Sequence, residues 1–129
     1  MNTATEPTRF AMPELQKGEL YAGAIIQPDG TGHHTILLPG DNDYADWNTQ
    51  IDWAKSLGGD LPDRVEGPLL FKFLEDEFKS EWYWLNTQHA SNSAYAWYQN
   101  FNNGNQNNNN TNNKLRARAV RRTNRSPPC

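Results

Sequence analysis

The spacing of hydrophobic residues changes at about Glu81. Before that residue, two segments carry apolar side chains three and four positions apart, which is typical of amphipathic helices. After it, three segments alternate apolar and polar residues with a period of two, which is typical of strands. Ahead of the helices, the stretch from Gly18 to Gly40 places two apolar runs around a Pro-Asp-Gly turn sequence and predicts a β-hairpin. This order predicts an α+β domain.

The first helix is predicted within residues 41–59. Its apolar stripe consists of Tyr44, Trp47, Ile51, Ala54 and Leu57. Glycines at positions 58 and 59 stop the pattern, as expected at a helix C-terminus. The acidic segment ahead of it holds Asp41, Asp43 and Asp46, and we expect it to cap the helix rather than to bind a metal ion.

The second helix is predicted after residue 62. Asp63 and Glu66 have the spacing of a capping box, but Pro68 would remove a backbone donor from a helix that began at Arg64. We therefore expect the regular helix to start near Gly67, with the proline in its first turn. Its buried stripe is predicted to be Leu69, Leu70, Phe73, Leu74 and Phe78.

The strands are predicted at residues 82–88, 94–101 and 115–122. In the last of these, the apolar residues at 115, 117 and 119 share one face and the arginines at 116 and 118 share the other. Four tryptophans fall at apolar-patterned positions and are expected in the core: Trp47, Trp82, Trp84 and Trp97. Tyr98 follows Trp97, so in a strand it should face the opposite way, toward the surface and the asparagines that follow.

A run of asparagines separates the last two predicted strands. It reads NFNNGNQNNNNTNNK from Asn100 to Lys114 and holds ten asparagines. Composition alone favours disorder, because polar runs bury little apolar area. However, Phe101 should point into the core, and Asn103-Gly104 is a strong tight-turn dipeptide. These features favour a folded surface; a loose loop between two ordered strands is the alternative.

Length and composition fit one soluble domain. The chain has 129 residues, including five Trp, five Tyr and five Phe, which is enough for a core. No stretch approaches the ~20 apolar residues of a membrane span, and the first twenty residues do not resemble a signal peptide. Cytoplasmic synthesis is therefore expected. We expect a flexible arm at 1–17 and a frayed tail at 123–129; Cys129, the one cysteine, cannot form an internal disulfide.

Charge is divided unevenly along the chain. All fifteen acidic residues lie at or before Glu81, whereas residues 82–129 carry six basic residues and no acid. This basic segment raises the possibility of nucleic-acid binding through Arg116, Arg118, Arg121 and Arg122. The favoured interpretation is that a basic strand neutralises an acidic helical half, because the arginines sit within an alternating strand pattern.

Motifs for catalysis or for a metal site are weak. Gln27-Pro28-Asp29 is a sugar-binding tripeptide in calcium-dependent lectins, but here it lies in a predicted turn. The three histidines, His33, His34 and His89, lack metal-ligand spacing and are interpreted as turn or edge residues. Residues 75–77 are interpreted as a solvated acidic face. The sequence therefore predicts no metal, no cofactor and no enzymatic activity.

Several of these segments together resemble a family of phage and prophage proteins related to the C-terminal domain of the Lcl collagen-binding adhesin. The matching motifs are GGDLPDR at 58–64, LLF at 69–71, YWL at 83–85, AW at 96–97 and RAVR at 118–121. They occur in order over residues 18–122. The resemblance implies a C-type-lectin-like fold, with two helices, a small antiparallel sheet pairing N- and C-terminal strands, and a second sheet carrying the ligand face.

The resemblance also implies a function. C-type-lectin-like domains serve as variable proteins of diversity-generating retroelements, which rewrite adenine-rich codons such as those of asparagine near the 3′ end of a gene. Residues 98–113, followed by LRARAVRR, resemble that arrangement. The implied function is a non-enzymatic ligand-binding or display module of phage or prophage origin. A structural tail or assembly protein is the alternative, and nucleic-acid binding is less favoured.

The implied partner is an unknown protein or surface ligand, with phage tail proteins as a further candidate. No membrane partner is expected, whereas virion association and a homo-oligomer are compatible with the resemblance. The expected ligand-binding residues are Tyr98, Asn100, Asn102, Asn103, Asn105, Asn107, Asn108, Asn109, Asn110, Asn112 and Asn113.

Overall fold

The predicted hairpin is present at the start of the described chain. The computed structural model describes residues 12–124. Strands β1 (Leu20–Ile26) and β2 (Gly32–Leu37) pair antiparallel. In the turn between them, Gly30 N–H donates to the Gln27 carbonyl at 2.9 Å, and Gly30 has φ 90°. The Gln-Pro-Asp tripeptide is therefore part of a turn, as predicted. Most of the expected N-terminal arm (1–11) and of the expected tail (125–129, with Cys129) lies outside the described residues.

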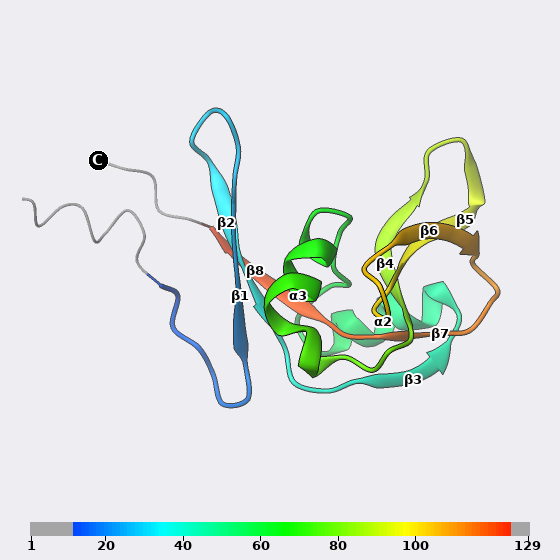
Figure 1. Cartoon of the computed structure of the whole chain (residues 1–129), viewed down its shortest axis with the longest axis horizontal. Helices are drawn as coiled ribbons and strands as arrows, with labels where there is room; N and C mark the ends of the chain where they lie inside the picture. Colours follow the sequence, from blue (N-terminus) through cyan, green and yellow to red (C-terminus); the bar gives the residue numbers. More distant parts are fainter. Residues whose placement is uncertain (1–11, 125–129) are drawn as a thin grey trace, which may run out of the picture.

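Two sheets are joined by the C-terminal segment (Figure 1). The smaller has the order β1-β2-β8, in which β8 (Val120–Asn124) pairs antiparallel with β2. The larger has the order β3-β7-β4-β5-β6 and is mixed, because β4 and β7 run parallel. Its strands are β3 (Asn42–Ala45), β4 (Trp82–His89), β5 (Asn92–Asn100), β6 (Gln106–Asn110) and β7 (Leu115–Ala117).

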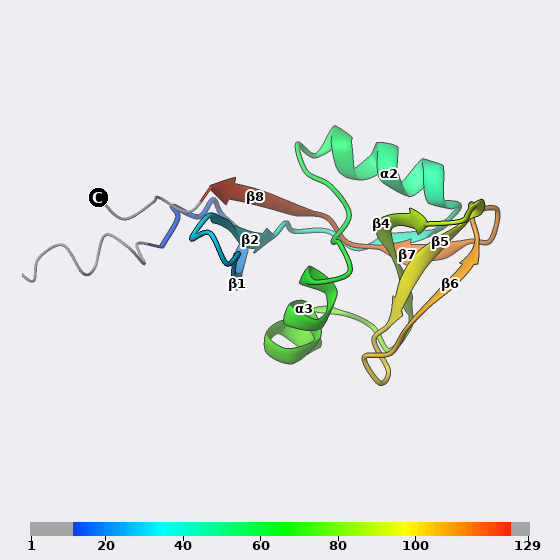
Figure 2. The same cartoon turned by 90° about the horizontal axis from the view of Figure 1, so that it is seen from above.

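Two α-helices lie on opposite sides of this arrangement (Figure 2). The first, α2 (Trp47–Ser56), starts at Asp46, whose Oδ1 accepts a hydrogen bond from Thr49 N–H at 2.8 Å. The capping role predicted for the acidic segment is thus confirmed for Asp46. The predicted stripe is too long at both ends, because Tyr44 belongs to β3 and is 49% exposed, and Leu57 follows the helix and is 45% exposed.

The second helix, α3 (Glu66–Leu74), begins one residue before the predicted start. Asp63 Oδ1 accepts from Glu66 N–H at 2.7 Å, and Glu66 Oε1 accepts from Asp63 N–H at 2.9 Å, which confirms the capping box. Pro68 lies in the first turn, as predicted. The short 3-10 helix η2 (Glu75–Glu77) follows and is exposed. The prediction of Phe73 as a buried residue is wrong, since its side chain is 63% exposed.

Strand β4 separates two clusters of buried side chains. Trp84 faces the α2 side and packs with Ala96, Tyr98, Leu115, Ala117 and Ala119. Its neighbour Tyr83 faces the α3 side and packs with Leu37, Leu70, Phe101 and Val120. Phe101 is 2% exposed, so its predicted position in the core is confirmed. Trp82 is 42% exposed, and its prediction as a core residue is wrong.

The predicted strand at 115–122 is split into β7 and β8. The break at Arg118 and Ala119 lies where the chain passes from one sheet to the other (Figure 1). At this point Arg118 Nη2 donates to the Leu38 carbonyl at 2.9 Å, and Leu38 N–H donates to the Ala119 carbonyl at 2.9 Å. Burial lowers the pKa of the Arg118 guanidinium. A period-two pattern shows the two faces of this segment but not the point where its pairing partner changes.

Candidate functional site

The asparagine run forms an ordered edge strand. β6 pairs antiparallel with β5 and lies at the free edge of the five-stranded sheet. In the turn before it, Gly104 N–H donates to the Asn100 carbonyl at 2.7 Å, and Gly104 has φ 81°. In this turn the positive φ falls on the glycine, and every described residue with a positive φ is a glycine. The loose-loop alternative is therefore wrong.

Side-chain amides fix the backbone at both ends of this strand. Three asparagines accept, through Oδ1, the N–H group two residues further along the chain, which is the pattern of an Asx turn. These pairs are Asn100 with Asn102, Asn103 with Asn105, and Asn110 with Asn112, each at 2.9 Å. The turns that enter and leave β6 are thus stabilised by asparagine side chains.

Two further asparagines cover the free edge of β6. Asn100 N–H donates to the Asn105 carbonyl, so the backbone groups of residues 105, 107 and 109 face β5, and the N–H groups of 108 and 110 point away from it. Asn107 Oδ1 accepts the outward N–H of Asn108, and Asn109 Oδ1 accepts that of Asn110, both at 2.8 Å. These bonds occupy donors that an added strand would need.

The strand period divides the run between two faces of the sheet. Asn107 lies opposite Tyr98, on the α2 side, whereas Asn108 lies opposite Trp97, on the α3 side. The eleven expected ligand-binding residues are therefore not gathered into one face. The structure instead places a shallow cavity near each face.

The first cavity has a volume of ≈ 310 Å³ and lies at the β5–β6 turn. It is lined by Tyr98, Asn100, Asn103, Asn105, Gln106 and Asn107. The expected surface position of Tyr98 is wrong, since its side chain is only 8% exposed. Its ring stacks on Trp82 with 4.6 Å between centroids, and burial raises the pKa of its hydroxyl. Tyr98 therefore presents only a small part of its surface to this cavity.

The second cavity lies toward the far end of β5 and has a volume of ≈ 260 Å³. Its lining is His89, Asn92, Tyr95 and Asn108. The His89 ring stacks on Trp97 at 6.3 Å between centroids, with 10° between the planes. Of these residues, Asn108 was expected to bind a ligand and Tyr95 to flank the binding surface. Nothing in the alternating pattern shows that His89 at the end of β4 reaches Trp97.

Four side chains of the run project without hydrogen bonds. They are those of Asn102, Asn105, Asn108 and Asn112, none of which bonds to any residue between 12 and 124. Asn113 instead donates to Asn109 Oδ1. Asn102, Asn109, Asn110, Asn112 and Asn113 line neither of the two cavities. The run thus combines asparagines that hold its backbone with others whose amides make no hydrogen bond within the described residues.

The described arginines of the basic C-terminal segment, up to Arg122, form contacts within the molecule. Arg116 pairs with Asp41 at 2.7 Å and with Asp43 at 3.1 Å. Arg121 pairs with Glu19 at 2.9 Å, and a similar pair joins β8 to the loop before α3. These contacts agree with the neutralisation of an acidic half by a basic strand.

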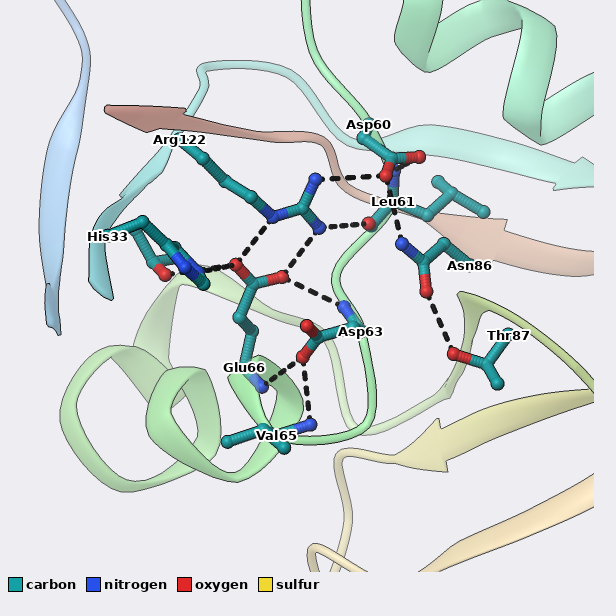
Figure 3. A network of polar contacts seen from close by, with 10 residues as sticks. His33, Asp60, Leu61, Asp63, Val65, Glu66, Asn86, Thr87 and Arg122 are labelled. Carbon is teal, nitrogen blue, oxygen red and sulfur yellow. Dashed lines mark hydrogen bonds and ion pairs between the residues drawn. The ribbon is translucent and has the colours of Figure 1, made fainter. Parts of the chain in front are cut away.

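A buried carboxylate lies at the centre of the polar network in Figure 3. Glu66 is fully buried and accepts hydrogen bonds from Arg122 Nε and Nη2, both at 2.7 Å. His33 Nε2 lies 2.8 Å from the same carboxylate. Burial raises the pKa of Glu66, but the bonds from Arg122 and from Asp63 N–H outweigh it, so the pKa lies below its ordinary value. The network connects β2, β8 and α3.

The histidine prediction needs correction at β2. His33 and His34 lie in the central strand of the smaller sheet and not at an edge or in a turn. His34 is 6% exposed, and its Nδ1 lies 2.7 Å from the Tyr21 hydroxyl. Their side chains point to opposite faces, as the strand period requires. The network and both histidines therefore stabilise the fold, and neither of the two cavities described above is lined by them.

Among residues 12–124, no three His, Cys, Asp or Glu side chains come together in a way that could hold a metal ion. Within the described part, no helix combines the length and the apolar character that a membrane span requires. Comparison with protein-family models and with curated proteins finds no match to this chain.

Proposed function

We propose that this chain is a non-enzymatic ligand-binding or display module, with its ligand surface along the β5–β6 edge. One observation carries the proposal: an ordered edge strand whose backbone is held by its own asparagines while four neighbouring amides project unbonded. Binding surfaces of this kind combine a rigid frame with adaptable side chains. The two roles are met here within fourteen residues of chain.

We further propose that this chain is of phage or prophage origin and has a C-type-lectin-like fold. We propose that it is the variable protein of a diversity-generating retroelement. Support comes from the polar edge strand β6, which is followed along the chain by the buried β7. Substitution at the edge would leave this closing segment unchanged. The gene and its surroundings test the retroelement link. The asparagine codons should be AAC or AAT, and a near-identical template and a reverse-transcriptase gene should lie nearby. A genome without the template and without the reverse-transcriptase gene contradicts the link.

The present chain should bind any single protein weakly. An amide that exchanges water for a partner gains only ~1 kcal/mol, and strong interfaces usually depend on Trp, Tyr or Arg. The display proposal is tested by randomising Asn102, Asn105, Asn108 and Asn112 together and selecting against a panel of purified proteins. Most variants should stay folded, and the selection should give binders tighter than the parent chain. A folded library without binders contradicts the proposal.

A structural accessory role is favoured by one separate observation. Phe73 is 63% exposed beside an open cavity of ≈ 440 Å³, lined by Leu20 and residues 72–77. Apolar side chains exposed in this way occur at contacts between chains. Closely related copies distinguish the two roles: variation confined to the asparagines supports display, and variation scattered over the surface supports the accessory role.

A further inference from the structure

Arg64 differs from the other arginines in the described part of the chain. Arg116, Arg121 and Arg122 pair with carboxylates, and Arg118 donates to backbone carbonyls. Arg64 contacts neither kind of group between residues 12 and 124. Its side chain is exposed, although it lies in the acidic half of the sequence. Among the described arginines, the one whose guanidinium contacts no carboxylate or backbone carbonyl therefore lies outside the basic C-terminal segment.

The guanidinium of Arg64 is held in a defined position. It lies over the Trp97 ring, 3.5 Å from its centroid, and its Nε donates to Gln106 Oε1 at 3.0 Å. Gln106 Nε2 in turn donates to the Arg64 carbonyl and to Gln99 Oε1, both at 2.9 Å. Gln99 is fully buried and donates to the Gly67 carbonyl at 2.7 Å. This chain of bonds fixes the arginine against β5 and β6.

The two Nη groups of Arg64 remain unbonded within the described residues. A guanidinium presents its N–H groups in a planar fork, which matches the two oxygens of a carboxylate. Because the stacking on Trp97 and the bond to Gln106 restrict the side chain before any ligand arrives, less entropy is lost on binding. The site has one unpaired arginine, which balances a single negative charge and not a polyphosphate.

Neutral polar groups lie around the Trp97 ring that this cation covers. The Trp97 ring stacks with His89, which lines the ≈ 260 Å³ cavity together with Tyr95, and Asn108 lies directly opposite Trp97 with an unbonded amide. Ligand pockets for drug-sized molecules span roughly 300–1,000 Å³, so this cavity suits one small ring. Amides and a phenol at its walls are suited to hydroxyl groups.

We propose that Arg64, Trp97 and Asn108 form a site for an acidic saccharide of the uronic acid type. The Arg64 fork would bind the carboxylate, and the amides around the cavity would bind the sugar hydroxyls. The inference rests on the proposed function, in that it takes the β5–β6 edge as the ligand face. It adds an anchor outside the asparagine run, which every variant of that run would keep.

The test is a titration of the full chain with trigalacturonate, followed by tryptophan fluorescence. The expected result is saturable binding with a dissociation constant on the order of millimolar, and at least tenfold weaker binding after Arg64→Gln. Arg64→Lys should also weaken binding, because an ammonium group lacks the planar fork. The control Lys72→Gln removes one charge from an exposed residue of α3 and should leave binding unchanged. Unaltered binding by a folded Arg64→Gln variant overturns the proposal.

A second pair of variants applies if Arg64→Gln does not fold. Asn108→Asp and Asn102→Asp each add one negative charge to an unbonded, nearly isosteric side chain, but only the first places it opposite Trp97. The first should weaken binding at least fivefold and the second should not. Equal effects of the two substitutions overturn the proposal.

Further titrations distinguish the ligand classes. Galactotriose should bind much more weakly than trigalacturonate, since it lacks the carboxylates. Oligoglutamate that binds as tightly as trigalacturonate would assign the site to acidic peptides, and inorganic phosphate that binds more tightly would exclude a carboxylate site; either result overturns the proposal. The display library tests the proposed function and this titration tests the saccharide site, so either proposal can be contradicted without the other. The library changes the asparagines, whereas the titration uses the parent chain.

Discussion

Single asparagines in one run have different roles. Asn107 and Asn109 satisfy outward N–H groups of the edge strand, whereas Asn102 and Asn112 make no side-chain hydrogen bond within the described residues. All four residues are asparagines, so composition cannot show which of them has which role. The separation follows from the direction in which each backbone N–H points in the ladder.

The first prediction concerns these edge residues. The double variant Asn107→Ala and Asn109→Ala should lower the free energy of unfolding by about 1–3 kcal/mol, since the two bonds to the edge N–H groups and the bond from Asn113 to Asn109 are lost, at ~1 kcal/mol each. It should also self-associate more readily, because the edge donors become free. Urea denaturation and sedimentation measure the two effects. The matched double variant Asn102→Ala and Asn112→Ala should stay within about 0.5 kcal/mol of the parent; equal losses in both would contradict the assignment.

A second residue-scale prediction concerns Gly104. It has φ 81°, and a Cβ there would lie 2.9 Å from the Phe71 ring. Gly104→Ala should therefore combine backbone strain with a steric clash and lower the free energy of unfolding by roughly 2–4 kcal/mol. Gly30→Ala is the control, because Gly30 has φ 90° but open space around it, and should cost only about 1 kcal/mol. Thermal unfolding of both variants compares them; similar losses would mean that Phe71 moves aside.

At the scale of elements, the Glu66 network joins α3 to strands of the smaller sheet. Its members come from residues 33, 63, 66 and 122, which are far apart in the sequence. Only the capping-box spacing of Asp63 and Glu66 is visible as a local pattern. The bonds from β2 and β8 depend on how the sheet packs against the helix start.

The third prediction is a pH dependence. The pKa of Glu66 lies below its ordinary value of 4.5 in the folded chain, so its contribution to stability is complete above about pH 4.5 and is lost as pH falls toward the folded pKa. Glu66→Gln should lower the free energy of unfolding at pH 7 by about 3–5 kcal/mol, because Arg122 loses its buried partner. The difference between parent and variant should shrink as the pH falls below 4.5.

Denaturation at a series of pH values from 7 to 3 measures this difference. The comparison isolates Glu66 from other carboxylates with lowered pKa values, such as Glu19, because both proteins contain them. Glu75→Gln, in the exposed η2, is the control and should not change the curve. A difference that stays constant across this range would exclude Glu66 as the titrating group.

At the scale of the whole molecule, two sheets share one C-terminal segment and two helices cover opposite sides (Figures 1 and 2). The two core clusters meet along β4, where Tyr83 and Trp84 point in opposite directions. This layout leaves β6 as an edge strand. Alternate side chains of β6 point toward the α2 side and toward the α3 side of the sheet. The proposed ligand surface at this edge is therefore divided, and the proposed anchor, Arg64, comes from the loop before α3.

Sequence pattern was sufficient for most of the local elements, but it predicted neither β3 nor β6 as a strand. Periods of 3.6 and 2 predicted both helices, the change to strands and the burial of Phe101, because these depend on which side chains can share one face. The hairpin was predicted by two apolar runs around a Pro-Asp-Gly turn sequence. Turn and cap residues predicted that α2 stops before Gly58, that Asp46 caps its start and that Pro68 lies in the first turn of α3. Each of these residues satisfies a local backbone requirement. The α+β class follows from the order of these elements.

The tertiary structure decided what no local pattern contains. It set where β7 ends and β8 begins, which aromatic residues are buried, which arginines are neutralised and which asparagines remain free. Each of these depends on contacts between residues distant in sequence, such as Tyr98 with Trp82 or Arg64 with Trp97. The sequence by itself determined a polar segment closed by strands; long-range packing and ladder geometry determined which of its amides a ligand can reach.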